Sequence, residues 1–218
     1  EWLDVMPIFD NGQALNILSY GDGEVIFSEE IVWLPKLNDD PEYHYENIQK
    51  AIDLAVSKMP RVDAIGVSSA GVFIGNAPMV SSIFYKVPRS QWDFVKTVFD
   101  RAAAEIDPKI PILVANDGDV TALAGAMDLN DTEVMGIAMG TSEAVGYVDN
   151  EGRITGWLNE LAFVPVDYQE DGGVDEWSRD KGVGAMYFSQ QAVARLAPRA
   201  GFEFGAMPYP EQLKKVQA

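Results

Sequence analysis

The first part of the chain alternates short apolar runs with residues that favour turns. This pattern predicts β-strands at residues 5–9, 14–20 and 24–33. Asp10-Asn11-Gly12 and Gly21-Asp22-Gly23 lie between these runs and are typical of tight turns. We therefore expect an antiparallel meander at the start of the fold.

A helical pattern follows at residues 41–59, where Ile48, Ile52 and Ala55 recur on one face. Asp40 is the expected N-cap, and Pro41 suits the first turn. The next elements are a buried strand, a second helix that begins near Ser90 and ends before Pro108, and another strand. With the strands placed at residues 64–68 and 112–115, the order predicts an α/β arrangement.

From residue 116 the pattern begins again. It predicts a helix at 119–127, strands at 134–139 and 144–149, a glycine- and acid-rich loop at 168–181, and a helix at 185–197. We expect two domains, residues 1–115 and 116–218, with a ligand cleft between them. Residues 211–218 look like the first turns of a further helix, so a longer protein with a truncated second domain is expected.

Charge and composition narrow the function classes. The formal net charge is −18, from 34 acidic and 16 basic residues. This balance argues against nucleic acids and anionic membranes as partners, because both are bound through basic clusters. The chain has no cysteine, and its one histidine, His44, is expected on the surface. No apolar run reaches membrane-spanning length, and we expect a cytoplasmic location.

Asp117 is the first candidate for chemistry, because it follows a buried strand and precedes a helix. A carboxylate at this point can accept the proton of an attacking hydroxyl. The alternative is a helix cap, a role for which Asn116 and Asp119 also compete.

Two small-residue turns could approach phosphates. Gly140 and Thr141 follow a strand, so their backbone N–H groups could hold phosphate oxygens, although most such turns only reverse the chain. Asp10 ends the first strand and could orient a magnesium-bound water, with Gly12 allowing the chain to turn nearby. A hairpin turn explains Asp10 and Gly12 at least as well.

Glu160 interrupts an apolar run. A buried, unpaired carboxylate is costly, so Glu160 either meets a polar ligand such as a sugar or caps a local turn. Trp157 and Phe163 lie close in sequence and could stack on a sugar, or pack in a core.

Taken in order, these segments resemble the ROK family of sugar kinases and related proteins, within the actin-like ATPase superfamily. Asn116-Asp117-Gly118-Asp119 resembles the family's Asn-Asp-Ala-Asn segment, and Asn159-Glu160 with Pro165-Val166-Asp167 resembles its Gly-Glu-x-Gly-His-x-Pro-Val-Asp run. The other matching segments are Asp10-Asn11-Gly12-Gln13, residues 65–72, residues 136–148, and residues 182–189, which are similar to Gly-Cys-Leu-Glu-x-Tyr-x-Ser.

Several positions depart from the family pattern. Glu143 stands in the second phosphate segment, where the family is glycine-rich, and Ser142 precedes it. Phe163 replaces the family histidine, and Ala185 replaces a sugar-binding glutamate. Because the zinc-binding cysteines are all missing, no zinc is expected.

The resemblance implies a ribonuclease H-like, actin-like ATPase fold and an ATP- and magnesium-dependent sugar kinase. Asp117 would be the base, and Asn116, Glu160 and Gly71 would bind the sugar. Members of this family often form dimers, so the resemblance also implies a possible homodimer. The phosphate-binding residues would be Asp10, Gly12, Gly140 and Thr141, with Asp10 also orienting the magnesium ion through water.

Two other functions stay open. One is a sugar-sensing or sugar-binding protein with little kinase activity, which the altered loops favour. The other is a structural or interaction domain, in which Asp117 would only cap a helix. A DNA-binding repressor, which is also known in this family, would need a basic helix-turn-helix segment. This sequence has none, although an N-terminal extension could carry one.

Overall fold

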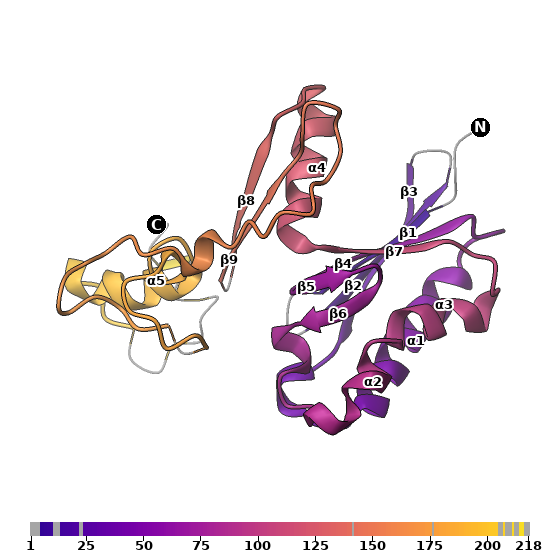
Figure 1. Cartoon of the computed structure of the whole chain (residues 1–218), viewed down its shortest axis with the longest axis horizontal. Helices are drawn as coiled ribbons and strands as arrows, with labels where there is room; N and C mark the ends of the chain where they lie inside the picture. The colour runs from indigo at the N-terminus through magenta and orange to yellow at the C-terminus, as the bar shows by residue number, and fades with distance from the viewer. Residues whose placement is uncertain are drawn as a thin grey trace. The chain divides into compact units, whose positions relative to one another are not determined.

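The structure is a computed structural model of the whole chain (Figure 1). It describes residues 5–10, 14–21, 24–140, 142–175, 177–204, 207, 211 and 214–215, and gives the backbone alone for 5–10, 14, 16, 20 and 36. The chain divides into two compact units, Glu1–Val120 and Thr121–Ala218, which we call the N-terminal and C-terminal units. The domain boundary after residue 115 stays a prediction.

The N-terminal unit is built on a five-stranded sheet with the order β3-β2-β1-β4-β7. The antiparallel meander of β1, β2 and β3 is confirmed. Both β4 and β7 then join in parallel on the other side of β1. The strands are β1 (Val5–Asp10), β2 (Ala14–Gly21), β3 (Glu24–Val32), β4 (Ala64–Ser69) and β7 (Ile112–Asn116).

Helices α1 (Pro41–Val56) and α3 (Val98–Ile106) pack side by side over one face of this sheet (Figure 1). The predicted cap is confirmed, since the Asp40 carboxylate accepts a hydrogen bond from Glu42 N at 3.0 Å. Apolar side chains from the sheet and both helices form one core, which includes Ile17, Trp33, Ile52, Ile65, Val98 and Val114.

The second predicted helix is divided in the structure. A 3-10 turn at Arg89–Gln91 leads into the short α2 (Trp92–Val95), and α3 begins only at Val98. The Thr97 hydroxyl donates to Phe94 O at 2.8 Å, a local bond that competes with helix continuation. The helix nevertheless ends before Pro108, as the sequence predicts.

His44 is buried, so its predicted place on the surface is wrong. Its side chain has 0% exposure and meets the rings of Trp33, Tyr43 and Phe84 edge to face. Neither ring nitrogen has a hydrogen-bond partner within the described part of the chain. Burial lowers the pKa of His44, and the nearby Asn38 backbone, too poorly aligned for a full hydrogen bond, and the charge of Asp40 only reduce the shift. The histidine therefore behaves as a neutral aromatic core residue.

A short hairpin follows β4 that the sequence pattern did not predict. It consists of β5 (Val72–Ile74) and β6 (Ala77–Val80), joined at Gly75 and Asn76. Asn76 bonds the outer edge of β7, since it accepts from Val114 N at 3.0 Å and donates to Ile112 O at 3.2 Å. This side chain pairs backbone groups that an edge strand otherwise leaves open.

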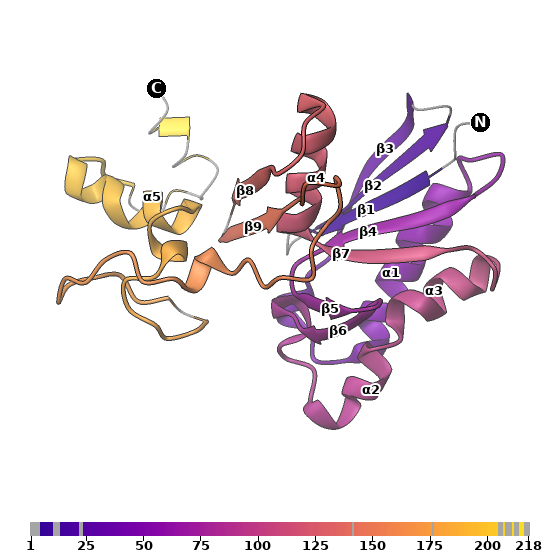
Figure 2. The same cartoon turned by 45° about the horizontal axis from the view of Figure 1, so that its top comes forward.

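In the C-terminal unit, β8 (Met135–Met139) and β9 (Glu143–Tyr147) form an antiparallel pair. The later turns of α4 (Asp117–Leu129) cover one face of this pair, as both views show (Figure 2). Gly136 permits the contact, because a Cβ at that position would lie 2.3 Å from Ala122 N.

The final predicted helix is shorter than expected. Residues Gly184–Met186 form the 3-10 turn η5, and α5 spans Gln190–Leu196. The turn ends at Met186, and Ser189 has an extended backbone and caps α5, because its hydroxyl accepts from Gln191 N at 3.1 Å. Most of residues 211–218, the other predicted helix, lie outside the described residues. No helix within the described ranges is long and apolar enough to cross a membrane.

Candidate functional site

The carboxyl ends of three parallel strands meet at one edge of the N-terminal sheet. Phe9 of β1 pairs with Ser68 of β4, and Ser69 pairs with Asn116 of β7. The backbone of Asp10 therefore ends at the same edge as Asn116. The Asp10 side chain lies outside the described residues, as does the whole of Gly12. This edge is where open α/β sheets place their ligands.

Asn116 links two parts of this edge. Its Nδ2 donates to Gly71 O at 2.8 Å, and its Oδ1 accepts from Gly118 N at 2.8 Å. The second bond satisfies an N–H group in the first turn of α4, so Asn116 acts as a cap. The first bond ties the end of β7 to the turn that follows β4.

Asp117 is half-buried at the start of α4. Its Oδ1 accepts from Gly118 N at 3.1 Å, a longer contact than the one Asn116 makes to the same group. Burial raises the pKa of Asp117, and the backbone N–H groups of Gly118 and of Asp117 itself reduce the rise. A carboxylate with a raised pKa is a stronger proton acceptor, which suits a general base.

Gly71 occupies a turn that only glycine fits. Its φ is +138°, and a Cβ there would lie 2.5 Å from Val80 O. The Ser81 hydroxyl donates to Ala70 O at 2.6 Å and holds the same turn from the end of the β5–β6 hairpin. Sequence reasoning did not find Ser81 or the hairpin. The Gly75-Asn76 turn dipeptide could have indicated the hairpin, whereas no local signal marks the bond of Ser81.

The remaining predicted residues belong to the C-terminal unit. Gly140 follows β8, and its carbonyl accepts from Gln190 N at 2.8 Å. A Cβ on Gly140 would meet nothing closer than Ser142 O at 3.9 Å, so the backbone is open on that side. Thr141 lies outside the described residues. Gly140 itself is therefore small and open on that side, as close approach of a phosphate requires.

Glu160 is exposed and immediately precedes the 3-10 turn η4 (Leu161–Phe163). Its carbonyl accepts from Phe163 N at 3.2 Å, but its side chain does not cap the turn. The structure thus brings Gly71, Asn116 and Asp117 together in one unit, and describes Gly140 and Glu160 in the other.

Glu143, the carboxylate beside the Gly140 turn, is only 8% exposed. Its Oε2 would lie 2.5 Å from a Cβ placed on Gly184, so it packs closely against η5. Burial raises the pKa of Glu143. The cause is desolvation, which makes the charged carboxylate less favourable than it is in water.

The residues do not fit a zinc site. The sequence has no cysteine, and Phe163, at the family's histidine position, packs on the Trp177 ring at 5.2 Å. The described ranges contain no group of three or more histidine, cysteine or acidic residues able to hold a metal ion.

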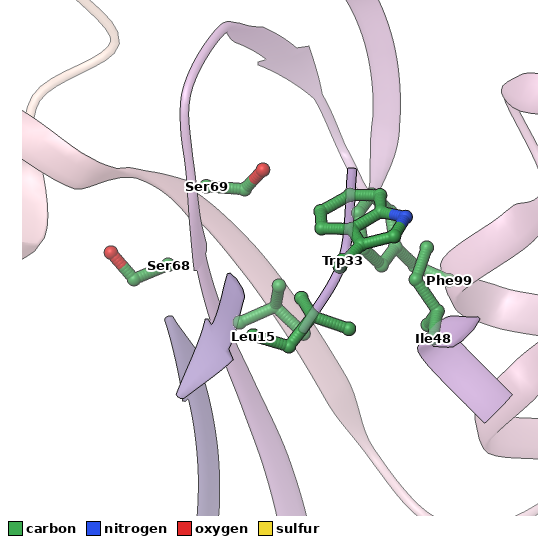
Figure 3. Close-up of a pocket in the computed structure, with 7 residues that line it drawn as sticks. Leu15, Trp33, Ile48, Ser68, Ser69 and Phe99 are labelled. Carbon is green, nitrogen blue, oxygen red and sulfur yellow. The ribbon is translucent and has the colours of Figure 1, made fainter. Parts of the chain in front are cut away.

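Two hollows in the described parts of the chain lie away from the predicted site residues. The first, of about 10 Å³, lies in the N-terminal core between apolar side chains and the two serines that end β4 (Figure 3). It is about as large as one water molecule needs. The second, of about 210 Å³, is an open depression beside Met127 and Asp131 in the C-terminal unit. The predicted site residues line neither hollow.

No family model and no curated protein sequence matches the chain. Solved structures do match. A ROK family glucokinase from Streptomyces griseus in complex with glucose and AMPPNP has a TM-score of 0.69 and 15% identity, over 90% of this chain and 60% of its own. A ROK family transcriptional regulator, a homolog of the E. coli MLC protein, has a TM-score of 0.68 and 17% identity. The match covers 92% of this chain and 51% of the regulator.

A ROK hexokinase from Thermus thermophilus has a TM-score of 0.65 and 17% identity, over 91% of this chain and 64% of its own. The chain therefore spans between half and two thirds of the length of these proteins. Identities this low show the fold alone. The chain has the mixed α/β fold of the ROK sugar kinases and regulators, which confirms the resemblance seen in the sequence.

Proposed function

We propose that this chain carries out the ATP-dependent phosphorylation of a sugar or related polyol. The observation that carries the proposal is the junction of β7 and α4. There Asn116 provides the shorter contact to the first turn of α4, and the half-buried Asp117 has a raised pKa. A carboxylate so placed is suited to accept a proton rather than only to cap a helix.

In the proposed reaction, Asp117 takes the proton of the acceptor hydroxyl as the hydroxyl oxygen attacks the terminal phosphorus of ATP. A new oxygen–phosphorus bond forms, the bond to the bridging oxygen breaks, and ADP leaves. Asn116, Gly71 and Glu160 hold the acceptor, and the backbones of Gly12, Gly140 and Thr141 approach the phosphates. Asp10 would orient a magnesium ion through water, and that ion would neutralise phosphate charge. Catalysis then comes mainly from position and electrostatics.

The comparisons support the substrate class. The similar Streptomyces griseus structure holds glucose and AMPPNP, which is an ATP analogue with a nitrogen bridge. The open space beside Gly140 also fits a bound phosphate chain. The cleft between two domains, the truncated second domain, the homodimer and the cytoplasmic location stay predictions, as does the absence of nucleic-acid and membrane partners.

A second function, sugar sensing without phosphorylation, has its own support. Ala185, at the family's sugar-binding glutamate position, is fully buried, and Phe163 packs on an aromatic ring. Two sugar contacts that the resemblance implies are thus replaced by apolar packing. One similar structure is a transcriptional regulator.

Incubation of the full-length gene product with Mg-ATP and pooled hexoses, amino sugars and polyols separates the two functions. The kinase proposal expects ADP release that depends on the acceptor, and a product heavier by one phosphoryl group in mass spectra. Saturable sugar binding without a phosphorylated product would overturn the kinase proposal and support sensing.

A further inference from the structure

The segment that would carry zinc in the family is closed by hydrogen bonds in this chain. Val166 N and Asp167 N both donate to Gly182 O, at 2.7 and 2.9 Å. Gly182 N donates in turn to Gly173 O at 2.7 Å. A Cβ on Gly182 would lie 1.8 Å from Asp167 O, and its φ is +73°, so only glycine allows the closure.

Side chains strengthen the base of this loop. The Tyr187 hydroxyl donates to the Asp167 carboxylate and accepts from Gly173 N at 3.2 Å. The Arg195 guanidinium lies 4.4 Å from the centre of the Tyr187 ring and donates to Met186 O at 3.0 Å. We call Asp167, Gly173, Tyr187 and Arg195 the Tyr187 clamp.

The charges of the clamp agree with its geometry. The hydrogen bond from Tyr187 is the largest cause that lowers the pKa of Asp167, and the Gln169 backbone and Arg195 act in the same direction. Asp167 is therefore held as a carboxylate, the form that accepts the tyrosine proton donor most strongly.

The clamp is connected to the predicted sugar-binding residue Glu160. Gly184 N donates to Val164 O at 3.0 Å, and Val164 N donates to Leu161 O at 3.1 Å. A bridge between Pro165 and Val183 lies beside these bonds. The chain that leaves η4 is thus paired with the chain that enters η5, and the clamp closes the far end of this pairing.

We propose that the Tyr187 clamp, and not a metal ion, fixes residues 167–187 in this chain, and that through this pairing it positions Glu160. The fixing is independent of the proposed function, whereas the positioning rests on it. Tyr187 is a positioning residue in this scheme.

Trypsin provides a direct readout, because Arg179 and Lys181 are exposed inside the clamped segment. In Tyr187→Phe, which removes only the hydroxyl, we expect cleavage at these residues to become about tenfold faster, the factor for one hydrogen bond to a charged group. Tyr168→Phe is the matched control, since Tyr168 is 86% exposed, and its cleavage should equal that of the unmodified protein. Chelators and added zinc should change neither rate.

A double-mutant cycle tests the same contact if Tyr187→Phe folds poorly. Asp167→Asn should also speed cleavage, and the double variant should be little faster than either single one, because both changes break the same contact. Additive effects, an unchanged rate in both single variants, or faster cleavage of the unmodified protein by a chelator would overturn the proposal.

The positioning has a separate readout in the KM values. Tyr187→Phe should raise the KM for the acceptor several-fold while the KM for ATP stays unchanged. Equal rises in the KM for the acceptor and the KM for ATP, or no rise in either, would contradict the positioning role of Tyr187. If the unmodified protein has no kinase activity, the proposed function fails, while the cleavage results still decide whether the clamp replaces a metal.

Discussion

Asn116 Nδ2 donates to Gly71 O at 2.8 Å and so joins the end of β7 to the turn after β4. The same side chain accepts from Gly118 N at 2.8 Å. One residue therefore fixes both the glycine turn and the first turn of α4. Because Asn116 makes the shorter contact with that turn, the neighbouring Asp117 is suited to the role of base. The two bonds of Asn116 can be separated by substitution.

Asn116→Ser should keep the cap and lose the bond to Gly71, whereas Asn116→Ala should lose both. We expect the free energy of unfolding to fall by about 1 kcal/mol in the serine variant and by about 2 kcal/mol in the alanine variant. Urea denaturation measures both. Equal stability of the two variants would show that Asn116 does not cap α4.

The raised pKa of Asp117 predicts the pH dependence of activity. The base must be ionised, so kcat/KM for the acceptor should fall as the pH drops through the pKa of Asp117. The pH at which kcat/KM falls should therefore be above the ordinary aspartate pKa of about 3.9. A pH–rate profile on the acid side measures it. A rate that stays constant down to the ordinary aspartate range would contradict the role of Asp117.

The sequence predicted the parts of the fold that rest on regular patterns. The meander, α1 with its Asp40 cap, and the apolar strands β4 and β7 all follow from periodicity and turn residues. The β5–β6 hairpin was not predicted because its two strands are short and their residues are mixed in burial, so no alternation accompanies the Gly75-Asn76 turn signal. The burial of His44 was not predicted for another reason, since only the folded core shows that three aromatic rings enclose it.

For the candidate site, the local sequence is compatible with Asp117 as a general base or as a helix cap, and it does not distinguish the two roles. The choice depends on Asn116, whose partner Gly71 is 45 residues away in the chain. Contacts over such a separation leave no local signal. The packing of Glu143 against Gly184 and the Tyr187 clamp are of the same kind, since each joins distant segments of the C-terminal unit.

Gly136 tests the packing of the C-terminal unit. In Gly136→Ala the new Cβ would lie 2.3 Å from Ala122 N, so β8 or α4 must move. We expect a loss of about 1–3 kcal/mol in the free energy of unfolding, the usual cost of overpacking. Gly156→Ala is the control, because nothing lies within 4 Å of its Cβ position. Chemical denaturation that finds both variants alike would contradict the packing of α4 on β8.

His44 tests the core of the N-terminal unit. Its pKa is lowered in the folded state, so the unfolded state binds the proton more readily. The stability that neutral His44 supplies should be present above the unfolded pKa of about 6.5 and should decline as the pH falls below it, by up to about 1.4 kcal/mol per pH unit. His44→Phe should remove this part of the decline. Because the chain has one histidine, parallel pH profiles of the two proteins would contradict its burial.

The central claim is that Asp117 is the base of an ATP-dependent sugar kinase. The most direct measurement is acceptor-dependent ADP release from Mg-ATP by the full-length protein, compared with Asp117→Asn and with Asp128→Asn, an exposed aspartate near the other end of α4. The account predicts release that falls by about 10²–10⁴-fold in Asp117→Asn and is unchanged in Asp128→Asn. Equal release by Asp117→Asn and the unmodified protein, or no release by any of the three folded proteins, would contradict it.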